Sequence, residues 1–131
     1  MPTRPLSPHL SVYRMSRYTL ATSIANRFTG LALSAGLLLL VYWLVSVAGG
    51  APSYARATRV LSLPLVKVIY AALIVAFCYH LVAGIRHLVW DTGHGLERAQ
   101  SQRSAWLVVA VSLILMLVIG YCALLTGTHA P

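Results

Sequence analysis

Three long apolar stretches dominate the sequence, and each is long enough to cross a lipid bilayer. A membrane-spanning helix needs roughly 20 mostly apolar residues. We place these spans at residues 22–47, 64–90 and 105–126. Inside a bilayer the backbone polar groups of a segment must be satisfied internally, so helices are the expected form. The sequence therefore predicts an all-α membrane protein with three transmembrane helices.

The low charge content supports this class. Of the 131 residues, 59% are hydrophobic and 9% are charged, whereas a soluble domain usually carries about 25% charged residues. Such a chain has too few charges to coat a water-facing surface, and its spans leave no room for a separate soluble catalytic domain. We therefore treat residues 1–131 as a single membrane-anchor domain, with any catalysis in the membrane or in partner subunits.

The positive charges indicate an orientation and argue against nucleic-acid binding. The formal net charge is +8, and the Lys and Arg residues lie at the ends of the apolar runs, as the positive-inside rule expects. The tail of residues 1–21 and the polar loop of residues 91–104 share the side that is richer in Arg, and a short loop of residues 53–62 lies on the other. We predict a cytoplasmic amino terminus and a carboxy terminus on the opposite side.

Polar residues inside the second span form a stripe. An ionisable side chain within a membrane is costly and marks a functional-site hypothesis by default. His80, Gly84, His87 and Asp91 recur at helical spacing, so they share one face. His80 lies about 10 Å deeper than His87 at 1.5 Å rise per residue. His80 is therefore the candidate for a role inside the hydrocarbon.

Two interpretations of His80 remain open from the spacing. Histidine is a common axial ligand of haem iron, and a haem along the membrane normal would direct its propionates towards Arg27, Arg86 or His87. Gly84, one turn from His80, would let a flat macrocycle or another helix come close. The other interpretation is that His80 only donates a hydrogen bond to a neighbouring helix.

A second stripe lies in the first span. Ser23, Arg27, Gly30 and Ser34 recur at helical spacing on one face. A hydroxyl and a guanidinium placed together can bind a carbonyl or a propionate. A snorkelling Arg27 is the simpler interpretation of that residue taken alone, and Gly30 with Ser34 is typical of close helix packing.

Three segments together give the chain a family resemblance. They are Arg4–Tyr13 (RPLSPHLSVY), Ser23–Gly30 (SIANRFTG) and His80–Asp91 (HLVAGIRHLVWD). With these segments the chain resembles the cytochrome b subunit of succinate dehydrogenase, the larger membrane anchor of the type that carries one b haem and two anchors. The likeness covers nearly the whole chain, including the number of spans.

The resemblance implies a role for each matching residue. His80 stands where the family has an axial ligand of haem b, and Ser23, Ile24 and Arg27 stand where it has quinone-binding residues. Arg27 also stands where propionate contact is expected, and His87, Arg86 and Asp91 are haem-propionate or site-supporting candidates. One departure is Asn26, where many members have His; an Asn side chain cannot carry a proton charge.

The resemblance also implies a function and partners. The subunit would help to pass electrons from succinate to quinone in respiratory complex II, next to a flavoprotein subunit, an iron–sulfur subunit and membrane lipid. Because His80 is the deep histidine of this chain, the second ligand of a shared haem would come from a second membrane anchor with an intramembrane His. The absence of a transit-like stretch favours the bacterial inner membrane, with the mitochondrial inner membrane as the alternative. The rival function is a haem-free membrane scaffold or small transporter subunit.

Overall fold

The apolar runs form helices throughout the described part of the chain. The structure, a computed structural model, describes residues 17–127, and the side chains of residues 20–125. This part consists of four helices and no strand: α1 (Arg17–Ala48), α2 (Ala51–Leu61), α3 (Pro64–Asp91) and α4 (Arg98–Gly127). Three of them are long and apolar enough to cross a membrane, over Leu20–Ala48, Pro64–Asp91 and Arg98–Leu125. The predicted all-α fold with three membrane spans is confirmed.

Two helices begin earlier than the predicted spans. α1 is helical from Arg17, the first described residue, which lies within the predicted tail, and no glycine or proline separates Arg17 from the apolar run. α4 begins at Arg98 rather than at residue 105, and the carbonyl of Glu97 accepts a hydrogen bond from the Ser101 N–H over 2.8 Å. The remainder of the tail, residues 1–16, lies outside the described residues. Helical conformation thus extends from the apolar spans into polar sequence at this end of the bundle.

The segment between the first two spans is a helix, and the expectation of a loop over residues 53–62 is wrong. Gly50 adopts φ 80°, a conformation that glycine tolerates well, and the chain reverses there before α2 begins. Pro52 lies in the first turn of α2, where its missing N–H costs little. Ala57 is only 1% exposed, so α2 packs against the rest of the bundle instead of remaining in solvent.

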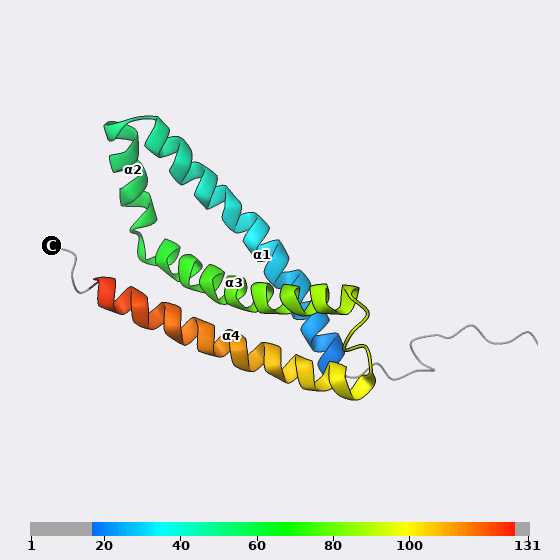
Figure 1. Cartoon of the computed structure of the whole chain (residues 1–131). Coiled ribbons are helices and arrows are strands. Elements are labelled where there is room, and N and C mark those ends of the chain that lie inside the picture. The colour runs from blue at the N-terminus through cyan, green and yellow to red at the C-terminus, as the bar shows by residue number, and fades with distance from the viewer. Residues whose placement is uncertain (1–16, 128–131) are drawn as a thin grey trace, which may run out of the picture.

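The helices form an open bundle in which α3 and α4 run side by side (Figure 1). The beginning of α1 lies close to the end of α3 and the beginning of α4, and α1 then diverges from them towards α2 (Figure 1). Small side chains bring α3 and α4 together: Cys78 and Ser112 are buried, and the Ser112 hydroxyl donates to the Cys78 carbonyl over 3.5 Å. α3 therefore packs against both α4 and the first part of α1, and α1 diverges from α3 further along (Figure 1).

Most large apolar side chains of the bundle point outwards. Leu38, Leu65 and Leu117 are 71%, 72% and 73% exposed. In water such a surface would favour aggregation or association. In a bilayer it faces lipid tails or other membrane subunits, which fits the three spans. The fold therefore leaves most of its apolar surface for its surroundings and keeps a small interior.

Candidate functional site

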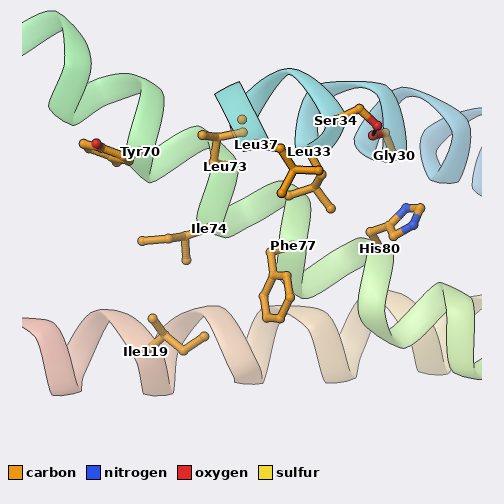
Figure 2. Close-up of a pocket in the computed structure, with 11 residues that line it drawn as sticks. Gly30, Leu33, Ser34, Leu37, Tyr70, Leu73, Ile74, Phe77, His80 and Ile119 are labelled. Atoms are coloured by element: carbon orange, nitrogen blue, oxygen red, sulfur yellow. Dashed lines mark hydrogen bonds between the residues drawn. The ribbon is translucent and has the colours of Figure 1, made fainter. Parts of the chain in front are cut away.

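A large groove lies between α1 and α3, with His80 at one end. Its volume is about 670 Å³. Its lining is mainly apolar and consists of Gly30, Leu33, Ser34, Gly36 and Leu37 from α1, Tyr70, Leu73, Ile74, Phe77 and His80 from α3, and Ile119 from α4. Figure 2 shows the His80 imidazole directed from α3 towards Gly30 and Ser34 of α1. We call this space the His80 groove.

The His80 ring is oriented by α1. Its Nδ1 atom lies 3.1 Å from the carbonyl oxygen of Asn26 and 3.3 Å from the hydroxyl oxygen of Thr29. A backbone carbonyl can only accept, so we assign the proton to Nδ1. The Thr29 hydroxyl directs its own proton to the carbonyl oxygens of Ala25 and Asn26, at 2.8 and 3.0 Å. The Nε2 atom of His80 is then the unprotonated nitrogen, with a lone pair that can bind a metal.

Gly30 makes this close approach of the imidazole possible. A Cβ atom added at Gly30 would lie 2.9 Å from Cε1 of His80, closer than real Cβ contacts allow. Any other residue at position 30 would push the ring away from α1 and lengthen its hydrogen bond to Asn26. Gly30, whose spacing with Ser34 is typical of helix packing, therefore also contacts His80.

The predicted quinone-binding residues lie on α1 at the same end of the bundle. Ile24 and Arg27 line a separate shallow groove of about 300 Å³, together with Phe28 and Leu31. Ser23 lies one turn before Arg27, and Gly30 of the His80 groove lies three residues after Arg27. Arg27 is exposed and makes no hydrogen bond or ion pair with the described residues. Its charge is therefore available to a group outside this part of the chain.

The three polar residues near the end of α3 have different surroundings. Arg86 does not line the His80 groove: its guanidinium donates to Ser104 and Ser101 of α4 and to Thr22 of α1. His87 contacts the edge of the Trp90 ring at 5.2 Å between centroids and also lies outside the groove. Asp91 is exposed at the last position of α3. The structure thus brings His80 next to α1 and directs Arg86 elsewhere.

Two contacts of the site could not be predicted from the sequence. Thr29 and the carbonyl of Asn26 hold the His80 ring, and only the crossing of α1 with α3 reveals them. The Oδ1 atom of Asn26 is buried without a hydrogen-bond partner among the described residues. Gly84 has nothing within 4 Å of an added Cβ atom, so no described helix of this chain explains that glycine. Among the described residues, Asn26 Oδ1 therefore lacks a hydrogen-bond donor and Gly84 lacks a close neighbour.

Comparison with known proteins identifies the family. Residues 1–119 match the family described as the succinate dehydrogenase/fumarate reductase transmembrane subunit. The chain belongs to this family. It is thus a membrane anchor subunit of an enzyme complex, and the alternative of an unrelated scaffold or transporter subunit is not supported.

The relatives include bacterial and mitochondrial proteins of this family. The chain is 43% identical over 112 residues to the succinate dehydrogenase cytochrome b556 subunit of Paracoccus denitrificans, covering 86% of this chain and 85% of that protein. It is 35% identical over 116 residues to the b556 subunit of Rickettsia typhi, covering 88% and 90%. It is also 38% identical over 113 residues to the human mitochondrial b560 subunit, covering 85% and 66%.

Proposed function

We propose that this subunit provides His80 as one axial ligand of a haem b, through its Nε2 atom, in a succinate:quinone oxidoreductase. The observation that carries the proposal is the hydrogen bond of Nδ1 to the Asn26 carbonyl over 3.1 Å, which leaves Nε2 as the metal-binding nitrogen. Metal-binding histidines typically donate their other ring N–H to a carbonyl or carboxylate in this way. The relatives carry cytochrome b in their names, which supports the same cofactor.

The surroundings of His80 suit a large, flat and mainly apolar group. Cofactor and small-molecule sites occupy about 300–1,000 Å³ and are mostly apolar with a few placed polar groups. The His80 groove has about 670 Å³ and an apolar lining. The Oδ1 atom of Asn26 is buried without a hydrogen-bond partner among the described residues. When bound, a haem supplies a one-electron redox centre.

The second iron ligand comes from another subunit in this proposal. Among the described residues that line the groove, His80 is the one histidine. A haem with two histidine ligands therefore requires a companion membrane anchor with its own intramembrane His. That anchor would cover part of the apolar surface that this chain exposes.

The quinone-binding role is proposed for Ser23, Ile24 and Arg27. The Ser23 hydroxyl and the Arg27 guanidinium are donors that can bind the carbonyl oxygens of a quinone. Arg27 is not engaged by the described residues, and Ile24 shares its shallow groove and offers apolar contact to the ring. Donors aimed at an oxygen stabilise the negative charge that develops on it. These residues would therefore favour reduction of the bound quinone.

The complete electron path then runs through several subunits. A flavoprotein subunit oxidises succinate, an iron–sulfur subunit carries the electrons to the membrane, and this anchor holds the quinone that accepts them. Arg27, His87 and Asp91 lie at the end of the bundle where propionates or the iron–sulfur subunit would be met, so we propose supporting roles for them. In this proposal, the end of the bundle that carries Arg27 faces the cytoplasm, and the carboxy terminus lies on the opposite side of the membrane.

Variants of the intact complex test the quinone site. Arg27→Ala and Ser23→Ala are compared with Arg56→Ala, which removes an exposed arginine from α2 at the opposite end. Arg27→Ala should lower quinone reduction by roughly 10²-fold, the lower range for loss of one placed donor. Succinate oxidation with an artificial dye should stay at the wild-type rate in all three. Normal quinone turnover in both Ser23→Ala and Arg27→Ala would contradict this site.

A further inference from the structure

Arg86 is a buried cation that is held entirely by neutral groups. Its side chain is 8% exposed. Its Nε atom donates to the Ser104 hydroxyl over 2.9 Å, and its Nη2 atom donates to the carbonyl and hydroxyl oxygens of Ser101 over 2.8 and 3.3 Å. Ser104 in turn donates to the Ser101 carbonyl over 3.0 Å. These contacts attach the end of α3 to the beginning of α4.

The same guanidinium also reaches α1 and lies over a tryptophan of its own helix. Its Nη1 atom donates to the Thr22 hydroxyl over 3.3 Å, and its central carbon lies 4.0 Å from the centroid of the Trp90 ring. The Trp90 indole donates to the Gly95 carbonyl over 3.1 Å. One side chain therefore joins three helices, and Trp90 beside it holds the connection between α3 and α4. The planar fork of arginine, with five donors, suits this geometry, and a lysine would not reproduce it.

No side-chain carboxylate of the described residues forms an ion pair with Arg86. The sequence has two acidic residues, Asp91 and Glu97, and both are exposed and form no ion pair with the described residues. Burying a charge without a counter-ion is costly unless its hydrogen bonds are well satisfied. A neutral side chain would join α3 to α4 at lower cost. The contact that the forked guanidinium adds beyond a link between α3 and α4 is the one to Thr22 of α1.

The contacts of Arg86 and Tyr79 with Thr22 fix the beginning of α1. Thr22 immediately precedes Ser23 and lies five residues before Arg27. The Tyr79 hydroxyl donates to the Thr22 carbonyl over 3.0 Å, so α3 holds Thr22 through both its side chain and its backbone. This is the end at which α1, α3 and α4 lie together before α1 diverges (Figure 1). The rotation of α1 at this point sets the direction of the side chains that follow Thr22.

We propose that Arg86 is a positioning residue for the quinone site, which acts by fixing α1 at Thr22 and so directs Ser23 and Arg27. The inference rests on the proposed quinone role of those two residues. Arg86 lines neither the His80 groove nor the groove formed by Ile24 and Arg27. A fixed α1 keeps the donors aligned before the quinone binds, and a misplacement of about 1 Å can lower a rate by up to about 10²-fold.

The test separates the contact to α1 from the contacts to α4. Thr22→Val replaces the hydroxyl by a methyl of similar size and leaves the Tyr79 bond to the Thr22 backbone intact. Ser104→Ala is the matched control, because it removes a contact of Arg86 to α4 and leaves the contact to α1. Thr22→Ser keeps the hydroxyl and is the rescue variant. Each is measured in the intact complex for quinone KM, quinone kcat, dye-linked succinate oxidation and the haem absorption band.

Thr22→Val should raise the quinone KM by roughly tenfold, within the range that misplacement of a group produces. Thr22→Ser and Ser104→Ala should stay within about twofold of wild type, and dye-linked activity and the haem band should not change. A wild-type KM in Thr22→Val, with Arg27→Ala impaired, overturns the positioning role and leaves the quinone site standing. An equal rise in Thr22→Val and Ser104→Ala also overturns it, since the effect would then be general loosening. Wild-type quinone turnover in Arg27→Ala overturns both proposals.

Discussion

The Nδ1 atom of His80 lies 3.1 Å from the carbonyl oxygen of Asn26, so the backbone of α1 orients a side chain of α3. The acceptor is a main-chain atom, and no substitution of the Asn26 side chain removes it. The tautomer of His80 therefore depends on how α1 crosses α3. Any change that moves these two helices apart at Gly30 alters the direction of Nε2, which is the atom that we propose as the iron ligand.

Gly30→Ala should displace the His80 imidazole. The added Cβ atom would lie 2.9 Å from Cε1, and relief of such overpacking costs about 1–3 kcal/mol. We expect a lower haem content or a shifted haem band in the purified complex, measured by absorption spectroscopy. Gly120→Ala is the control, because nothing lies within 4 Å of a Cβ atom there. Equal spectra for wild type and Gly30→Ala would contradict the observed approach of the ring to α1.

Thr29→Val should weaken haem binding and shift the haem midpoint potential without abolishing binding. The Thr29 hydroxyl lies 3.3 Å from Nδ1 of His80, while the Asn26 carbonyl remains as the principal acceptor. Loss of a partner of a metal-binding histidine typically lowers metal affinity or activity by about 10–100-fold. For Thr29→Val we expect a loss of haem affinity of about tenfold, the lower end of that range, together with a shifted haem midpoint potential in a redox titration. Thr29→Ser keeps the hydroxyl and should match wild type; a shift in Thr29→Ser as large as that in Thr29→Val would assign the effect to packing.

Ala57→Leu should destabilise the complex if α2 packs as described. Ala57 is 1% exposed, and added methylene groups in a filled space cost about 1–3 kcal/mol. Thermal loss of the haem band in detergent measures the change. Ala55→Leu, at an exposed position of the same helix, controls for altered helix propensity and hydrophobicity. Equal thermal transitions for the two variants would show that the α2 segment is not held against the bundle.

The orientation of the bundle can be tested with introduced cysteines. In a Cys78→Ala, Cys122→Ser background, Ala55→Cys marks α2 and Glu97→Cys marks the loop before α4; both positions are exposed. A membrane-impermeant maleimide added to spheroplasts should label Ala55→Cys at once and Glu97→Cys only after the membrane is opened. The reverse pattern would place the amino terminus outside and contradict the orientation that we infer from the arginine distribution.

The sequence predicts the spans well and the connections poorly. Three apolar runs are visible without tertiary information, and each forms a helix close to its predicted position. α2 was expected to be a loop because Pro52, Arg56 and Arg59 are typical of polar connections. Its helix is stabilised by the burial of Ala57 against the bundle, and such a contact between distant segments leaves no signal in the local sequence.

The candidate site shows the same division between local and tertiary information. His80 stands out as a histidine inside an apolar run, and the sequence analysis selects it. Thr29 and the Asn26 carbonyl do not stand out, because their roles depend on the crossing of α1 with α3. Arg86 was a candidate for propionate contact, whereas the early start of α4 supplies Ser101 and Ser104 as its acceptors. Spacing identifies which residues are unusual, and the fold identifies their neighbours.

The central claim is that Nε2 of His80 binds haem iron, and a reduced-minus-oxidised absorption spectrum of the purified complex tests it most directly. Wild type, His80→Ala and the control His94→Ala, which alters an exposed histidine between α3 and α4, are compared with subunit content confirmed on a gel. We predict a b-type band in wild type and His94→Ala, and its loss or conversion to a high-spin form in His80→Ala. An unchanged low-spin band in His80→Ala would show that another residue is the ligand.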